Sequence, residues 1–311
     1  MHLLVLCGPT ATGKTALAAD LAHRLGTELI SADSRQVYRG LDLGTGKDLG
    51  EYRKHAPPVR YHLIDIVDPE AGYSLFQYQR DCYRVMDLRA GEGGPASRVM
   101  VLAGGTGMYI EAVLRRYRIA NVPENPALRE SLAGRSREEL EAELKRKDAA
   151  LAARSDLSSG KRIIRALEVW QAGQARAVEY SRPPERDFSF TVFGTRMDRA
   201  ALRARIDARL EARLEAGMVE EVAGLLARGV SRERMQVLGM EYREITRYLT
   251  GECTREEMAA TLRHEIHMLA KRQETYFRGM ERRGVPITWL DPEQGADALL
   301  RSWDERKASH G

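Results

Sequence analysis

The chain has 311 residues, of which 43% are apolar and 30% charged, a composition that indicates a folded protein and excludes a disordered one. Its net charge is only +4, and the excess of Lys and Arg lies entirely after residue 110. No apolar run approaches the ~18 residues of a membrane span, and the first residues lead into an apolar strand rather than a signal peptide. The three cysteines are widely separated and predict neither a disulfide framework nor a metal site. We therefore expect a cytoplasmic protein without a membrane segment.

The first 110 residues alternate short apolar segments with amphipathic ones. Strands are expected at residues 3–7, 28–31, 61–67 and 98–103, and helices at residues 15–25 and 74–88. Short apolar strands separated by helices are typical of a parallel sheet that helices cover on both faces.

The pattern changes between residues 116 and 187, where charged helical segments replace the strands. Helices at 137–154 and 161–170 predict an inserted helical domain. A returning strand is expected at 188–194, followed by helices at 200–227, 241–249 and 255–278 and a short strand at 285–290. The expected organisation is thus a discontinuous core, 1–115 and 188–311, interrupted by an insertion at 116–187.

One motif near the start of the chain indicates a specific chemistry. Residues 8–15 read GPTATGKT and match GxxxxGK[ST], with an apolar strand before them and an amphipathic helix after them. Glycines let several backbone N–H groups point at one anion, and the helix adds its positive N-terminal end. In such a loop Lys14 contacts phosphate oxygens and the Thr15 hydroxyl holds Mg²⁺. The predicted diphosphate-binding residues are Gly8, Pro9, Thr10, Ala11, Thr12, Gly13, Lys14 and Thr15.

The motif identifies a binder of diphosphate or triphosphate, but not a reaction. An NTPase usually has an apolar strand that ends in a Mg²⁺-binding Asp, whereas residues 98–103 run into Gly104-Gly105-Thr106-Gly107. This argues against a kinase or ATPase. The glycine segment is consistent with a second anion site or with a turn that packs a helix on the sheet.

Asp33 follows the second expected strand. Because the carboxyl ends of parallel strands form the ligand crevice, Asp33 would face the phosphate loop as a general base or an indirect Mg²⁺ ligand. An Asp at this position can equally cap a short helix, and the residues alone leave both interpretations open.

Two groups of basic side chains follow. Arg205, Arg209 and Arg213 recur every four residues and share one stripe of an expected helix. Lys161, Arg162 and Arg165 form a second group. Taken alone, such stripes are typical of solvated helix faces.

Six segments in order resemble the tRNA dimethylallyltransferase family. They read GPTATGKT, ISADSRQVYRGLDLGTGK, YHLIDIVDP, LAGGTGMYI, RIIRALEV and AKRQETYFRGM, within a resemblance that runs from Leu3 to about Asp291. The resemblance implies an α/β fold of the P-loop NTPase type, with a parallel sheet flanked by helices and a small inserted all-helical domain that binds tRNA. It also implies transfer of a dimethylallyl group from dimethylallyl diphosphate to the exocyclic 6-amino group of the adenine just 3′ of the anticodon, in tRNAs that read codons beginning with U.

The resemblance further implies roles for single residues. Asp33 would be the base that the amino group requires, since its lone pair is delocalised into the ring. Thr106 would contact the flipped nucleotide, and Arg209, with Arg205 as second choice, would join Lys14 and the Mg²⁺ held by Thr15 in neutralising the diphosphate. The implied tRNA-binding residues are Asp33, Ser34, Arg35, Gln36, Thr106, Arg129, Lys161, Arg162, Ile163, Ile164, Arg165, Met240, Glu241, Tyr242 and Arg243.

Three segments depart from the family pattern: residues 44–48, residues 158–160, which replace an Asn-Asp-Pro-like turn, and residues 239–242, which are longer than the usual Gly-Tyr junction. Gly44-Thr45-Gly46-Lys47-Asp48 stands where Gly-Thr-Ala-Lys-Pro is common, which leaves the role of Lys47 open.

Three other functions remain as alternatives: a free-nucleotide (adenylate) isopentenyltransferase, a P-loop small-molecule kinase and a non-catalytic RNA-binding module. The helical insertion and the Arg-rich C-terminal half favour tRNA. We expect a monomer, because one bound tRNA requires no symmetric partner.

Overall fold

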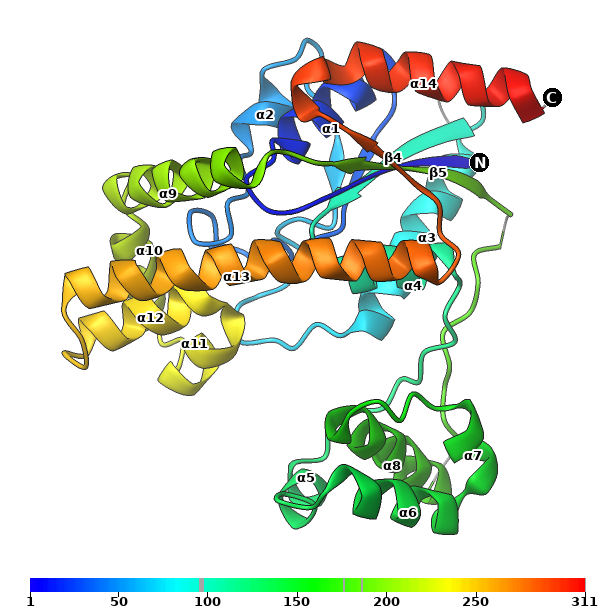
Figure 1. Ribbon diagram of the computed structural model, residues 1–311, viewed down its shortest axis with the longest axis vertical. Helices are drawn as coiled ribbons and strands as arrows, with labels where there is room; N and C mark the ends of the chain where they lie inside the picture. Colours follow the sequence, from blue (N-terminus) through cyan, green and yellow to red (C-terminus); the bar gives the residue numbers. More distant parts are fainter. Residues whose placement is uncertain (95–97, 176, 186, 311) are drawn as a thin grey trace. The chain divides into compact units, whose positions relative to one another are not determined.

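The computed structural model describes residues 1–94, 98–175, 177–185 and 187–310, which form two compact units (Figure 1). Unit 1 comprises Met1–Arg116 and Pro184–Gly311, and unit 2 comprises Tyr117–Pro183. Among the described residues, every helix is too short or too polar to cross a bilayer.

Unit 1 is built on a parallel sheet with the strand order β3-β2-β4-β1-β5-β6. The strands are β1 (His2–Cys7), β2 (Leu29–Ser31), β3 (Tyr61–His62), β4 (Val99–Gly104), β5 (Ser189–Thr195) and β6 (Ile287–Leu290). Cys7 at the end of β1 pairs with Gly104 of β4 and with Gly194 of β5. The segments that follow β1 and β4 therefore leave the sheet side by side, which brings the phosphate loop next to the Gly104–Thr106 segment.

Helices cover both faces of this sheet because its strands alternate their apolar side chains between two cores. Leu3 and Val5 pack with α3 (Leu75–Gly91), α4 (Gly107–Leu114) and the end of α13 (Arg255–Arg282). Leu4 and Leu6 pack instead with α1 (Lys14–Arg24) and α14 (Gly295–His310). Figure 1 shows these two helix layers on opposite sides of the strands.

A third core, formed by helices late in the chain, extends unit 1 beyond the sheet. It contains Leu202, Val222, Tyr242 and Leu262, each less than 5% exposed. Besides α13, its helices are α9 (Arg199–Glu215), α10 (Met218–Ala227), α11 (Arg232–Leu238) and α12 (Met240–Leu249). Two short elements complete the unit, α2 (Gly50–Arg53) and the 3₁₀ helix η2 (Pro292–Gln294).

Unit 2 has a helical core of its own, in which Leu140, Leu144, Ile163 and Leu167 are almost fully buried. Its helices are α5 (Pro126–Ser131), α6 (Arg137–Lys147), α7 (Ala149–Arg154) and α8 (Gly160–Ala175).

The predicted α/β class with a parallel sheet flanked by helices is confirmed. Three predicted elements were wrong in their extent. The strand expected at 61–67 ends at His62, because Leu63 and Asp65 adopt φ values of 62° and 56°. The helix expected at 137–154 is broken by the extended Asp148, which caps α7, and the helix expected at 200–227 is broken at Gly217 with φ of 102°.

Candidate functional site

A cavity of about 1180 Å³ lies at the carboxyl ends of β1, β2 and β4, entirely within unit 1. Segments far apart in sequence line it: the phosphate loop, residues 31–36, residues 44–48, residues 103–106, and parts of α9, α12 and α13. The predicted site residues that it brings together are Thr10, Ala11, Gly13, Lys14, Thr15, Asp33, Ser34, Arg35, Gln36, Thr106, Arg205, Arg209, Met240, Glu241 and Arg243.

The phosphate loop is shaped by contacts with β5. Gly8 has φ of 147°, and a Cβ there would lie 2.2 Å from the hydroxyl oxygen of Thr195, so only glycine fits. Thr12 is fully buried; its hydroxyl donates to the carbonyl of Pro9 at 2.9 Å and contacts the Thr195 hydroxyl at 2.7 Å. The Thr12 side chain thus anchors the loop on β5, while Gly13, with φ of 81°, turns the chain into α1.

Three cations, Lys14, Arg209 and Arg213, lie close together on the lining of the cavity. Desolvation, together with the nearby Arg209, lowers the pKa of Lys14 to about 8, and Asp33 acts in the opposite direction. Burial and the same Arg209 lower the pKa of Arg213 to about 10. Cations crowded in this way favour an anionic ligand, because the ligand's charge relieves their mutual repulsion.

The arginine stripe of α9, which the sequence pattern indicated to be a solvated helix face, lines the cavity instead. Arg205, Arg209 and Arg213 all line the cavity, since the adjacent apolar stripe of α9 packs into the third core and turns the arginines toward the phosphate loop. A guanidinium nitrogen of Arg205 lies 3.5 Å from the position of a Cβ on Gly13. The Nη2 of Arg209 donates to the carbonyl of Gly46 at 3.3 Å and forms an ion pair with Asp48.

Asp33 lies at the end of β2 and faces the same cavity. Its Oδ1 accepts a hydrogen bond from the backbone N–H of Arg35 at 2.9 Å, within turns rather than a helix. The side-chain oxygen of Thr106 accepts from the N–H of Ser34 at 3.0 Å, and the N–H of Thr106 donates to the carbonyl of Ala32 at 3.1 Å. The segments that follow β2 and β4 are therefore hydrogen-bonded to each other next to Asp33.

Gln273, on α13, joins the phosphate loop to the glycine segment after β4. Its Oε1 accepts from the N–H of Thr10 at 2.8 Å, and its Nε2 donates to the carbonyl of Gly105 at 3.0 Å. A Cβ on Gly105 would lie 2.4 Å from that Nε2, so a larger residue there would displace the amide of Gln273. Sequence reasoning assigned Gln273 no separate role, although it lies in one of the segments that carry the family resemblance.

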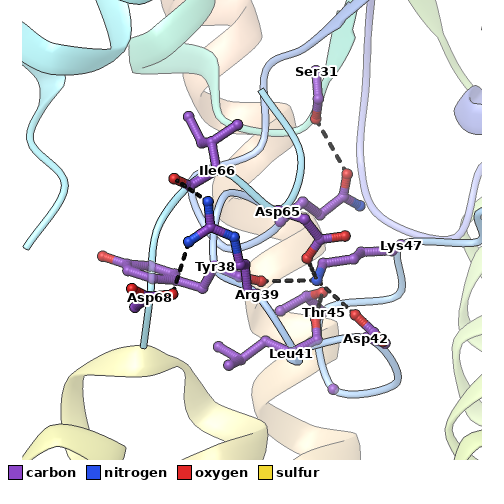
Figure 2. A network of polar contacts seen from close by, with 12 residues as sticks. Ser31, Tyr38, Arg39, Leu41, Asp42, Thr45, Lys47, Asp65, Ile66 and Asp68 are labelled. Atoms are coloured by element: carbon purple, nitrogen blue, oxygen red, sulfur yellow. Dashed lines mark hydrogen bonds and ion pairs between the residues drawn. The ribbon is translucent and has the colours of Figure 1, made fainter. Parts of the chain in front are cut away.

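The loop at residues 41–48 is held by buried polar contacts (Figure 2). Lys47 is 1% exposed, and its ammonium donates to the carbonyl of Tyr38 at 2.8 Å and to Asp42 at 2.6 Å and pairs with Asp65. The role of Lys47, which the sequence left open, is therefore structural. Its ammonium fixes the loop that carries Gly46 and Asp48.

Some predicted RNA-binding residues have other contacts. Tyr242 is buried, and its hydroxyl donates to Glu221 at 2.8 Å; Gln36 is 8% exposed and donates to the carbonyl of Gly46 at 3.2 Å. Ile163 lies in the core of unit 2. The side chains of Tyr242 and Ile163 are therefore part of the protein interior and do not form an RNA-binding surface.

The basic side chains of unit 2 are partly engaged within it. Arg129 and Arg165 both bind the buried carboxylate of Glu168, at 2.8 and 2.9 Å, and Arg162 pairs with Asp156 at 2.5 Å. Lys161 is exposed. The two arginines on Glu168 are thus held in fixed positions rather than being freely solvated.

The residues of the cavity fit Mg²⁺ bound together with a diphosphate. Mg²⁺ prefers oxygen ligands and usually takes only one or two from the protein, the rest coming from water and phosphate. Thr15 and Asp33 offer such oxygens in one cavity. Among the described residues, no group of three or more His, Cys, Asp or Glu side chains is placed to hold a metal ion.

A glycine-rich loop at the carboxyl edge of a parallel sheet, with a lysine and arginines beside it, is the arrangement of P-loop-type proteins, a class that binds diphosphates or triphosphates. Comparison with known families makes this class specific. A family model described as IPP transferase matches residues 36–280, and one described as isopentenyl transferase matches residues 1–56. The chain belongs to the IPP transferase family.

Individual relatives agree with this assignment. The chain is 45% identical to a tRNA dimethylallyltransferase 1 of Parabacteroides distasonis over 93% of this chain and 92% of the relative. It is likewise 45% identical to a protein of the same name from Geotalea uraniireducens, over 96% and 97% of the two chains.

Solved structures show the same fold. The tRNA isopentenylpyrophosphate transferase of Bacillus halodurans matches with a TM-score of 0.67 and 30% identity, covering 99% of this chain and 96% of that chain. A eukaryotic dimethylallyltransferase acting on tRNA matches with a TM-score of 0.73 over 99% of this chain and 79% of that one; at 18% identity it supports the fold alone.

Proposed function

We propose that this protein is a tRNA prenyltransferase that moves the dimethylallyl group of dimethylallyl diphosphate to the exocyclic 6-amino group of the adenine 3′ of the anticodon, in tRNAs reading codons that begin with U. The observation that carries the proposal is the cavity that Asp33 shares with Lys14 and Arg209, because a base and an anion cradle in one space suit alkylation with loss of diphosphate. Membership of the IPP transferase family and the names of the relatives support the same reaction.

The reaction forms one carbon–nitrogen bond and breaks one carbon–oxygen bond. The amino nitrogen attacks C1 of the dimethylallyl group, the bond from C1 to the diphosphate oxygen breaks, and the diphosphate leaves with the bonding electrons. Asp33 takes the proton that the amino group loses. Lys14 and Arg209, with Arg205 as the second candidate, neutralise the charge that develops on the leaving oxygen. Mg²⁺, held through Thr15, supplies further positive charge at the diphosphate when it is bound.

The adenine must leave its stack to reach a cavity of this kind. We assign contact with the flipped nucleotide to Thr106 and Ser34, which lie at the ends of β4 and β2. Further contacts with the tRNA are assigned to Arg35, Met240, Glu241 and Arg243 in unit 1 and, in unit 2, to the basic residues Arg129, Lys161, Arg162 and Arg165 and the adjacent Ile164. The enzyme is proposed to act as a monomer in the cytoplasm.

A direct assay separates this function from the alternatives. The protein is incubated with dimethylallyl diphosphate, Mg²⁺ and an unmodified anticodon stem-loop, and the nucleosides are analysed by mass. The expected product is dimethylallyl-adenosine at one position of the loop. Turnover of AMP or ADP in place of the stem-loop would instead indicate a free-nucleotide enzyme, and transfer of the γ-phosphate of ATP would indicate a kinase.

The role of Asp33 is tested by Asp33→Asn, which keeps the size of the side chain and its oxygen acceptor for the N–H of Arg35. Loss of the base should lower kcat by about 10²- to 10⁴-fold, while the affinity for the stem-loop stays unchanged. Asp68→Asn is the matched control, since Asp68 is exposed and paired with Arg39 outside the cavity. A near-normal kcat for Asp33→Asn would contradict the assignment.

A further inference from the structure

We propose that Asp48 is a placeholder for the diphosphate: its carboxylate holds Arg209 until the diphosphate binds and takes its place. Asp48 then weakens the binding of both the prenyl donor and the diphosphate product. The inference rests on the proposed function in one respect, the assignment of Arg209 to the diphosphate.

Arg209 is already bound to other parts of the protein. Its Nη2 has two hydrogens, and the structure gives that atom two acceptors, the carbonyl of Gly46 and the carboxylate of Asp48. Both acceptors belong to the loop at residues 41–48. The edge of the guanidinium that carries Nη2 is therefore already bound to the protein, and it must exchange partners before it can bind a ligand.

Arg209 belongs to a group of cations on the lining of the cavity. Arg209 is close enough to Lys14 and to Arg213 to lower the pKa of each, so the three cations form one cluster. Asp48 lies on the lining of the same cavity and favours the charged form of Arg213. A diphosphate carries more negative charge than one carboxylate and accepts paired hydrogen bonds from a guanidinium, so it is the stronger partner.

The loop at residues 41–48, which contains Asp48, is anchored by polar contacts. The buried ammonium of Lys47, directly before Asp48, is fixed by three acceptors: the carbonyl of Tyr38 and the carboxylates of Asp42 and Asp65 (Figure 2). On the other side, the carboxylate of Glu221 accepts from the backbone N–H groups of three successive residues, Asp42, Leu43 and Gly44, at 2.7 to 3.0 Å. These contacts fix the backbone on both sides of the loop, and Asp48 has a short side chain, whereas Arg209 reaches Asp48 through a long side chain with several rotatable bonds. Arg209 is accordingly the partner that moves.

The test measures the affinity for inorganic diphosphate in the presence of Mg²⁺, by calorimetry on the whole protein. Asp48→Asn removes the charge, keeps the shape, and tolerates the φ of 44° at this position. An ion pair this exposed is weak, so the variant should bind diphosphate only about twofold to fivefold more tightly than the unaltered protein. Asp48→Gly, which also accepts a positive φ, should show the same gain and guards against a folding defect in the first variant.

Glu51→Gln is the matched control. Glu51 lines the same cavity and carries the same charge, but it pairs with Lys54 rather than with an arginine of α9. Its affinity for diphosphate should stay at the unaltered value. In an Arg209→Ala background, Asp48→Asn should lose its effect, because the partner that it releases is gone.

The outcomes separate the inference from the function on which it rests. Equal or weaker binding by Asp48→Asn, an equal gain for Glu51→Gln, or a gain that persists without Arg209 would each overturn the placeholder role while leaving the proposed function standing. Failure of the unaltered protein to bind diphosphate at all would overturn the proposed function and the inference together.

Discussion

Lys14 shows how burial prepares a single side chain for its ligand. Desolvation and the nearby Arg209 lower its pKa to about 8, so the folded protein holds this ammonium at a cost that an anion would relieve. A bound diphosphate would stabilise the charged form and raise the pKa again. The same side chain thus both favours an anion in the cavity and limits the pH range in which the empty site is ready for one.

A pH dependence follows from this pKa. Below about 8 the ammonium of the free enzyme is charged, and above it the charge is lost. We expect kcat/KM for the prenyl donor to fall as the pH rises through about 8, because that ratio reports groups of the enzyme form to which the donor has not yet bound. The measurement varies the donor at saturating stem-loop. A Lys14→Arg variant that retains activity should lack this fall, since a guanidinium stays charged there. A profile for the unaltered enzyme that is flat across this range would contradict the prediction.

Local sequence signals identified some site residues and missed others for a physical reason. The phosphate loop and Asp33 could be predicted because each directly follows a strand, and parallel strands end at the same edge. Gln273 and Asp48 could not, because the packing of α13 brings Gln273 to the cavity and an irregular loop held by side-chain contacts brings Asp48 there. Arg213 is intermediate: its spacing from Arg209 was visible in the sequence, but the direction of the stripe depends on which face of α9 is buried.

At the scale of elements, the loop at residues 41–48 forms part of the site without regular secondary structure. Ladder hydrogen bonds do not hold it, and side-chain contacts replace them: those of the buried Lys47 from within the loop and of Glu221 from α10. The sequence gives no periodic signal for such a loop. It also gave no warning of Leu63 and Asp65, whose positive φ values end β3 and bring Asp65 to Lys47.

Removing the ammonium of Lys47 should therefore destabilise the fold. Lys47→Met keeps most of the side-chain volume but leaves Asp42 and Asp65 without their cation and the carbonyl of Tyr38 without a donor. Because both carboxylates are partly exposed, we expect a loss of about 2–3 kcal/mol in the free energy of unfolding, below the full cost of breaking a buried pair. Urea unfolding measures it. Lys54→Met, at an exposed ion pair, should cost less than about 0.5 kcal/mol. Equal stability of the two variants would show that the Lys47 cluster contributes nothing.

At the scale of the whole molecule, chemistry and positive charge are distributed between two units. The catalytic candidates lie in unit 1, whereas Arg129, Lys161, Arg162 and Arg165 lie in unit 2, which has its own core. Glu168, whose side chain is 0% exposed, binds two of these arginines and fixes their positions. A guanidinium held by one carboxylate retains further N–H groups for a phosphate, so this arrangement fixes the direction of the charge and does not cancel it.

This division predicts that RNA affinity and chemistry can be changed separately. The double variant Lys161→Ala with Arg162→Ala removes two exposed cations at the start of α8. Its affinity for the stem-loop should fall, and the slope of log K against log salt should decrease by about 1 to 2, while kcat at saturating RNA is unchanged. Lys145→Ala with Arg146→Ala, on the exposed side of α6 in the same unit, removes equal charge and should affect binding much less. Equal losses in the two double variants would mean that only net charge matters, and a lower kcat at saturation would mean that this end of α8 also positions the adenine.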